Sequence, residues 1–146
     1  MSPVTMSRTE REAFLADTHV GIVSIAHAGR GPLTVPVWYR YEPGGAVRFA
    51  TGATSHKIRL LRAAGRAGFC VQNETAPYQY VSVEGAVTIG KPDPDRDIRE
   101  IAIRYLGREQ GEAYLKMMAA DLNPDANVVV ILQPERWSSA DYRKLG

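Results

Sequence analysis

The chain has 146 residues, of which 45% are hydrophobic and 23% are charged, so its composition is that of an ordinary globular protein. At this length we expect one domain spanning residues 1–146, with a sizeable buried core. The net charge of +2 gives no global reason to bind nucleic acid, and the longest aliphatic run, 128–132, is too short to cross a membrane. The single cysteine, Cys70, excludes an intrachain disulfide. We also see no secretion signal at the N-terminus, and together these two features predict a cytoplasmic protein.

A helix is predicted first, and short strands follow it. Ser7 and Glu10 form a capping-box pair, in which each side chain can bond the backbone of the other, so a helix is expected over 7–16. Further helices are expected over 58–64, from the Asp93 cap to about residue 105, and over 109–120. Runs of β-branched residues and alternating polarity predict strands over 19–26, 33–41, 46–50, 67–72, 78–90, 128–132 and 136–139.

The order of these elements predicts the fold class. Strands that follow each other through short turns pair antiparallel. Six or seven such strands with few helices favour a mainly β (α+β) architecture, namely a closed or split antiparallel barrel with peripheral helices. Pro36 cannot donate a ladder hydrogen bond, so its strand is predicted to lie at an edge or to carry a bulge there.

The stretch from Thr51 to Lys57 carries the strongest functional signal. It joins a strand to a helix start through small and hydroxyl-bearing residues, and helix N-termini present free N–H groups and partial positive charge to anions. We therefore predict a phosphate cradle made of Thr51, Ser55, His56 and Lys57. On a helical wheel Lys57 falls on the inward side, where a cation needs an anion nearby. The alternatives are that its ammonium group extends to solvent or pairs with a carboxylate such as that of Glu84.

Two other groups of side chains each leave two interpretations open. The first is a stripe of arginines on the helical wheel of 58–66, made of Arg59, Arg62 and Arg66. This stripe is either a solvated face or a guide for a polyanionic ligand tail. The second group is aromatic and lies on predicted strands: Trp38, Tyr78 and Tyr80. These rings either stack on a flat ligand or pack in a core or an interface.

The sequence contains no motif that is typical of other kinds of active site. The three histidines, His19, His27 and His56, lie on different predicted elements without ligands at metal-binding spacing, so no metal is expected. There is no nucleophile elbow, no dinucleotide-binding fingerprint and no Walker loop. No catalytic residue can be assigned. A phosphate cradle and strand aromatics without an acid–base pair point to a flat, phosphorylated cofactor that carries the chemistry itself, such as hydride transfer.

Four segments together resemble the pyridoxamine 5′-phosphate oxidase-like split β-barrel family of flavin and deazaflavin oxidoreductases. They are residues 21–25, 33–41, 49–62 and 80–87. The third segment carries the T-x₃-S-x-K arrangement. The resemblance implies a homodimer with the cofactor, FMN or the deazaflavin coenzyme F420, at its interface. It places the cofactor ring along Val35, Pro36, Val37 and Trp38, and the phosphate at Thr51, Ser55 and Lys57. It also implies that the partner subunit contributes groups matching Tyr78, Gln79 and Tyr80.

Departures from the oxidase pattern favour the deazaflavin. Val35 and Arg40 occupy the positions of the oxidases' Arg-x₄-Lys pair, His56 replaces the arginine of their cradle, and the C-terminal Arg-x-His type motif is absent. The stripe of Arg59, Arg62 and Arg66 would suit the anionic tail of F420. We therefore expect a reductase that passes hydride from reduced F420 to an electron-poor small molecule, such as an enone or a quinone. The alternatives are an FMN-binding oxidoreductase of the same fold and a carrier that binds the cofactor without turnover.

Overall fold

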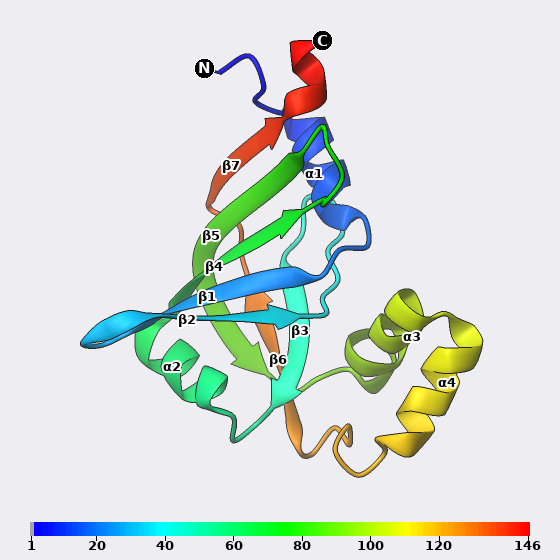
Figure 1. The fold of residues 1–146 in the computed structure, drawn as a ribbon. Coiled ribbons are helices and arrows are strands. Elements are labelled where there is room, and N and C mark those ends of the chain that lie inside the picture. Colours follow the sequence, from blue (N-terminus) through cyan, green and yellow to red (C-terminus); the bar gives the residue numbers. More distant parts are fainter. Residues whose placement is uncertain (1) are drawn as a thin grey trace.

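The computed structural model describes residues 2–146, which form a curled antiparallel sheet with helices around it (Figure 1). The strands are β1 (Gly21–His27), β2 (Arg30–Val37), β3 (Val47–Gly52), β4 (Arg66–Gln72), β5 (Gln79–Gly90), β6 (Asn127–Leu132) and β7 (Arg136–Asp141). The helices are α1 (Arg8–Ala16), α2 (His56–Ala64), the π-helical turn η1 (Pro94–Arg99), α3 (Glu100–Leu106), α4 (Arg108–Met117) and the short η2 (Tyr142–Leu145). No helix within residues 2–146 is both long and apolar enough to span a membrane.

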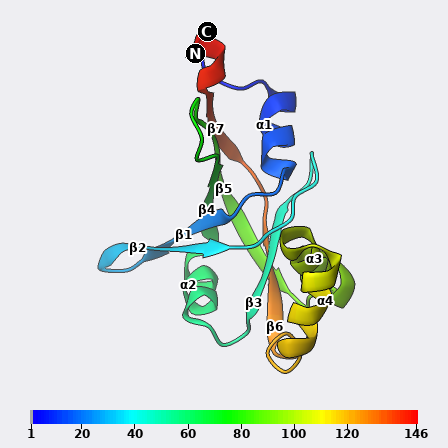
Figure 2. The same cartoon turned by 45° about the vertical axis from the view of Figure 1, so that its right-hand side comes forward.

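The sheet closes on itself only in part. Its strand order is β2-β1-β4-β5-β6-β3, and β7 pairs with β5. The long strand β5 makes the bend, because its first part pairs with β4 and β7 and its last four residues pair with β6. Beyond β2, the two ends of the sheet meet at one bridge between Arg40 and Arg48. The predicted split antiparallel barrel with peripheral helices is therefore confirmed (Figures 1 and 2).

The barrel interior follows from strand alternation. In β1, Val23 and Ile25 are fully buried while Ile22, next to Val23, is exposed, as expected for a sheet with one covered face. Close packing is required where β5 bends. A Cβ atom on Gly85 would lie 1.7 Å from the carbonyl oxygen of Gln133, so only glycine fits there. Pro36 lies on β2, at one end of the strand order, as its missing donor predicts.

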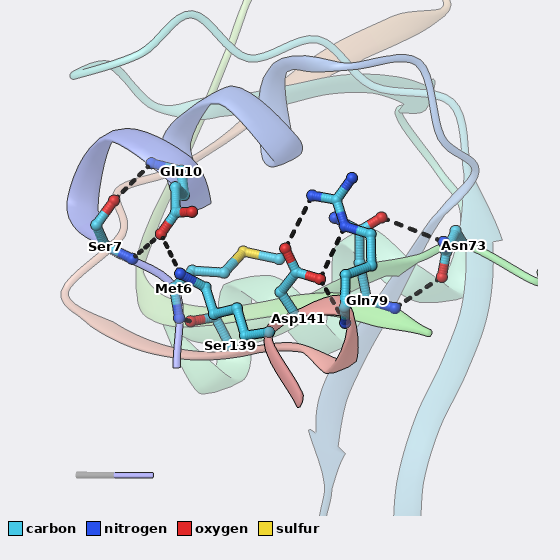
Figure 3. Close-up of polar contacts among 9 residues, drawn as sticks. Met6, Ser7, Glu10, Asn73, Gln79, Ser139 and Asp141 are labelled. Atoms are coloured by element: carbon cyan, nitrogen blue, oxygen red, sulfur yellow. Dashed lines mark hydrogen bonds and ion pairs between the residues drawn. The ribbon is translucent and has the colours of Figure 1, made fainter. Parts of the chain in front are cut away.

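The first helix begins as predicted from its capping box. The Glu10 N–H donates to the Ser7 hydroxyl, and the Ser7 N–H donates to the Glu10 carboxylate (Figure 3). The bond from the Ser7 backbone, with help from Lys144, lowers the pKa of Glu10 to about 2. The Met6 N–H donates to the Ser139 hydroxyl, so the chain start is joined to β7 near the C-terminus.

Two predicted elements differ from the structure, one in where it ends and one in its type of helix. The strand expected over 33–41 leaves β1 after Val37, because the Tyr39 N–H donates to the Tyr105 hydroxyl instead of a strand partner. The single helix expected after Asp93 is a π-helical turn followed by α3. The predicted end of the helix over 58–64 is confirmed, because Gly65 ends α2 with a φ of 70°. Arg66, which the helical wheel placed in the arginine stripe, instead opens β4.

Candidate functional site

A cavity of about 250 Å³ lies between one end of the barrel and the segment formed by η1, α3 and α4, which we call the helical arm. The barrel side of the cavity contains Pro36, Val37, Trp38, Ala50, Thr51, Lys57 and Asn127. The helical arm contributes Asp97, Ile98, Ile101, Ala102 and Tyr114, and Leu122 follows from the loop after α4. The cavity thus brings together five residues predicted from sequence, namely Pro36, Val37, Trp38, Thr51 and Lys57, with arm residues that were not predicted.

The phosphate cradle lies at the start of α2, directly after β3. Ser55 is the N-cap residue, but its side chain makes no capping hydrogen bond. Its hydroxyl oxygen is buried and has no hydrogen-bond partner among residues 2–146. A buried polar atom without a partner is uncommon in a folded protein. An anion held by the first N–H groups of α2 would supply the missing acceptor, so the cradle fits a phosphate.

Lys57 lines the cavity and is half-buried. Within the described part of the chain, Lys57 forms no ion pair with a carboxylate. Glu84, the carboxylate considered as a partner in the sequence, instead lies 3.5 Å from Arg136. The ammonium group of Lys57 is therefore free to meet a ligand anion at the positive end of α2.

Trp38 and Tyr114 form an aromatic wall of the cavity, and Tyr105 of the helical arm stacks on Trp38. The Trp38 ring stacks on Tyr105 with centroids 5.0 Å apart and planes 6° apart, and it lies 5.5 Å from the ring of Tyr114. The Tyr105 hydroxyl donates to the carbonyl oxygen of His19, and burial raises the pKa of Tyr105. One face of the Trp38 ring is thus covered by protein, which leaves the rest of the ring to meet a ligand.

Asp97 is a residue that the sequence analysis missed. It is 1% exposed, and its carboxylate accepts two hydrogen bonds of 3.0 Å from the Arg48 guanidinium and one of 2.8 Å from the Asp93 N–H. Arg40 lies 3.6 Å away. Burial alone would raise the pKa of Asp97, but these bonds and charges outweigh it and lower the pKa. Asp97 therefore stays ionised and fixes the helical arm to β3.

The arginine stripe and the histidines are arranged more loosely. Arg59 and Arg62 are exposed on α2, and Arg59 lies 3.3 Å from Nδ1 of His56. Arg66 pairs with Glu135 at 3.3 Å and does not extend the stripe. The rings of His27 and His56 are 5.5 Å apart. Among residues 2–146 no group of three histidine, cysteine or carboxylate side chains is arranged to hold a metal.

Tyr78, Gln79 and Tyr80 do not reach the cavity of their own chain. They lie at or just before the start of β5, which is beside β7 and η2 at the end of the sheet away from α2 (Figure 1). The Gln79 N–H donates to the Asn73 side chain, whose amide donates back to Gln79 (Figure 3). Val35 lies on β2 and packs against the barrel core from its edge.

Comparisons with known proteins bear on the fold. No family model matches the sequence, and no curated protein matches it either. A conserved hypothetical protein from Mycobacterium tuberculosis is 24% identical with a TM-score of 0.80, over 100% of this chain and 91% of that one. An F420 reductase is 22% identical with a TM-score of 0.62, over 87% and 94% of the two chains. An FAD-binding protein from Mesorhizobium loti is 22% identical with a TM-score of 0.64, over 92% and 94%.

Fold and comparisons together define the class of this protein. It has the split β-barrel fold that an F420 reductase and an FAD-binding protein also have. The cavity, the cradle at the start of α2 and the aromatic wall are built largely from residues on loops, helices and strand ends, which the sheet holds in place. The resemblance drawn from the sequence is thus confirmed at the level of the fold, and the function of the site is argued separately below.

Proposed function

We propose that this protein is a reductase that uses the deazaflavin coenzyme F420 to reduce an electron-poor small molecule. The observation that carries the proposal is the start of α2, where a buried, unbonded serine hydroxyl lies two residues before an unpaired lysine that lines a cavity with an aromatic wall. Both groups are suited to a phosphate. The F420 reductase and the FAD-binding protein of the same fold support a cofactor of the flavin type.

The residues of this chain would bind, orient and shield the cofactor. Thr51, Ser55 and Lys57 would hold its phosphate, and Arg59 and Arg62 would meet the anionic tail on the exposed side of α2. The ring would lie along the strand end formed by Val35, Pro36, Val37 and Trp38. When bound in reduced form, the deazaflavin supplies a hydride from its C5 atom. The helical arm covers the cavity and would keep water from the reacting atoms.

A homodimer is part of the same proposal. The register places Ile22, Cys70 and Ser82 in one row across β1, β4 and β5, on the side of the sheet that faces away from the core. We call this side the outer face. Val20 and Ile22 are 53% and 38% exposed there, and Tyr78 at the start of β5 is 55% exposed. Exposed apolar side chains that gather on one face mark an interface. A second copy on this face would bring its Tyr78, Gln79 and Tyr80 towards a cofactor.

Two alternatives use the same cavity. An FMN-dependent oxidoreductase would place the shorter FMN phosphate in the cradle and would leave Arg59 and Arg62 without a ligand. A carrier would bind either cofactor without turnover. His56, where flavin oxidases have arginine, favours the deazaflavin over FMN. The cytoplasmic location expected from the single cysteine agrees with an intracellular coenzyme of this kind.

The proposal is tested by titrating the purified protein with F420 and, separately, with FMN. Quenching of tryptophan fluorescence follows binding, because Trp38 lines the cavity. The Trp137→Phe variant isolates the Trp38 signal, since Trp137 lies on β7 beneath the Arg11 guanidinium. We expect F420 to bind more tightly than FMN. Tight FMN binding without F420 binding would reverse the order of the two cofactors, and binding of neither would remove the proposal.

A further inference from the structure

Three basic side chains, His27, His56 and Arg59, meet beside the start of α2. His27 is the last residue of β1 and His56 is the first residue of α2, and their rings are 5.5 Å apart. The Arg59 guanidinium reaches back by about one helical turn and lies 3.3 Å from Nδ1 of His56. We call these three residues the basic cluster. Because His56 lies between Ser55 and Lys57 in the chain, the basic cluster adjoins the cradle.

The contact with Arg59 determines which nitrogen of His56 can carry a proton. A guanidinium group has N–H donors and no acceptor, so Nδ1 of His56 accepts this hydrogen bond and carries no proton. His56 is therefore a neutral imidazole, with its hydrogen on Nε2, for as long as the contact persists. A proton on Nδ1 would break the bond and would set two like charges beside each other.

His27 is bonded in a way that permits both of its charge states. Its Nδ1 lies 3.2 Å from the carbonyl oxygen of Ala28. A carbonyl oxygen can only accept, so Nδ1 of His27 is the donor. The bond is the same whether or not Nε2 carries a second proton. An anion that drew Arg59 away would thus change the bonding of His56 and leave that of His27 as it is.

The charged groups on the elements that surround His56 are all basic. They are Lys57, Arg59 and Arg62 of α2, His27 of β1, Arg30 of β2 and Arg66 of β4. Among residues 2–146 only Arg66 of this set forms an ion pair with a carboxylate, that of Glu135. An anion in the cradle would therefore bring the negative charge that the basic cluster lacks.

We propose that His56 takes up a proton from solvent when an anion binds at the start of α2, so that the cofactor binds more tightly as the pH falls. This inference rests on the proposed function and adds a regulation of the same site. A guanidinium group bonds a phosphate or carboxylate oxygen more strongly than a neutral imidazole, so the anion draws Arg59 away. Nδ1 of His56 is then free to take a proton, and the resulting imidazolium attracts the anion.

The direction of the pH dependence follows from the uptake of a proton. A ligand whose binding adds a proton to the protein is favoured where protons are abundant. Histidine is the side chain that changes charge between about pH 5 and pH 8, so this is the range in which the affinity should rise as the pH falls. Lysine and arginine side chains ordinarily keep their charge throughout this range and add no pH dependence of their own.

The first test observes His56 directly, by NMR of the imidazole protons in untagged protein at neutral pH. The chain has only three histidines, and His56→Gln identifies the signal. F420 and the same deazaflavin without its phosphate-bearing tail are added in turn, because they share the ring and differ in the anion. We expect F420 to move the His56 signal towards its position in acid, and the phosphate-free deazaflavin to leave it in place. A His56 signal that stays in place with F420 bound would overturn the inference.

Sulfate is a second probe that does not depend on the cofactor, since it keeps its double charge across this pH range. We expect saturating sulfate to move the His56 signal in the same direction, and sodium chloride of equal ionic strength to leave it in place. Movement with sulfate but no binding of F420 would support the uptake of a proton and would remove the proposed function instead. Equal movement with both salts, or no movement with either anion, would overturn the inference.

The second test compares the affinities of F420 and the phosphate-free deazaflavin at about pH 5.5 and pH 8. We expect their ratio to be about fivefold larger at the lower pH in the unmodified protein and independent of pH in His56→Gln. Arg59→Ala removes the competitor for Nδ1, so the His56 signal of the free protein should already lie nearer its position in acid. Arg108→Ala on α4 is the control, because it removes the same charge from another exposed arginine, and it should leave the His56 signal unchanged. The same pH dependence in His56→Gln and the unmodified protein would overturn the role of His56.

Discussion

The Ser55 side chain is unusual for a buried polar group in a folded protein, because it makes no hydrogen bond. Its hydroxyl is buried at the start of α2 without a partner among residues 2–146. Leaving a buried polar group unbonded costs about 1–3 kcal/mol. A ligand oxygen at this point would remove that cost on binding. The residue is therefore better explained by a ligand than by the stability of the free protein.

Replacing Ser55 with alanine separates these two roles. Because the Ser55 side chain makes no capping bond, we expect Ser55→Ala to leave the free protein unchanged or more stable by about 1 kcal/mol, and to weaken cofactor binding by about 1 kcal/mol. Urea denaturation and a cofactor titration measure the two effects. Ser7→Ala is the control, because Ser7 caps α1, and it should destabilise the protein by about 1 kcal/mol. Equal destabilisation by both variants would contradict this interpretation of Ser55.

The site residues that could be predicted from sequence are those whose roles are local. Thr51, Ser55 and Lys57 stand out because a strand, a small loop and a helix start follow one another within a few residues. Asp97 and Tyr114 could not be found in this way. They lie on a different segment of the chain, and only the packing of the helical arm against β3 brings them to the cavity.

At the scale of elements, the helical arm depends on a few contacts with the barrel. The Asp97 carboxylate joins η1 to Arg48 of β3, and Tyr105 of α3 holds the backbone beyond β2. The two elements that the sequence mispredicted, the strand of 33–41 and the helix after Asp93, include residues that make these contacts. The strand pattern of 33–41 is correct in its alternation, but the Tyr39 N–H finds its acceptor on α3 rather than on β1. Local periodicity holds no information about such a partner.

Asp97→Asn tests the attachment of the arm. The pKa of Asp97 is lowered in the folded protein, so the stability it contributes is fully present above the unfolded carboxyl pKa of about 3.9 and is lost as the pH falls through the lower folded value. We expect Asp97→Asn to lower the free energy of unfolding by about 3 kcal/mol at neutral pH. The difference from the unmodified protein should shrink below about pH 4. Urea denaturation across this pH range measures both effects.

The control for this prediction is Asp95→Asn on the same turn, because Asp95 is exposed. It should change stability little at any of these pH values. A loss of stability in Asp97→Asn that stayed constant down to pH 2 would show that the ionised carboxylate is not what joins the arm to β3.

At the scale of the whole molecule, the split barrel was predictable because many short strands with tight turns allow few arrangements. The association of two copies is a different matter, since it depends on what covers the outer face. Ile22 points away from the core while its neighbours Gly21 and Val23 are buried. Removing its apolar surface should therefore affect assembly and leave the fold intact.

Ile22→Asp should shift the protein from dimer to monomer. A charge buried in a dimer interface without a partner is strongly unfavourable, so we expect the dimer to weaken at least tenfold, as measured by sedimentation velocity. Cofactor affinity should fall with it, because the partner's tyrosines would be lost. Met117→Asp on α4 is the control, because Met117 is 76% exposed and lies away from the outer face. An unmodified protein that sediments as a monomer at every concentration would refute the homodimer.

The most direct test of the account is whether Lys57 and the cofactor phosphate interact. The affinities of the unmodified protein and of Lys57→Ala are measured for F420 and for the same deazaflavin without its phosphate-bearing tail. If the phosphate lies in the cradle, Lys57→Ala weakens F420 by about 1–3 kcal/mol and leaves the phosphate-free deazaflavin unchanged. An equal loss for both ligands, or no loss for either, would contradict the cradle at the start of α2.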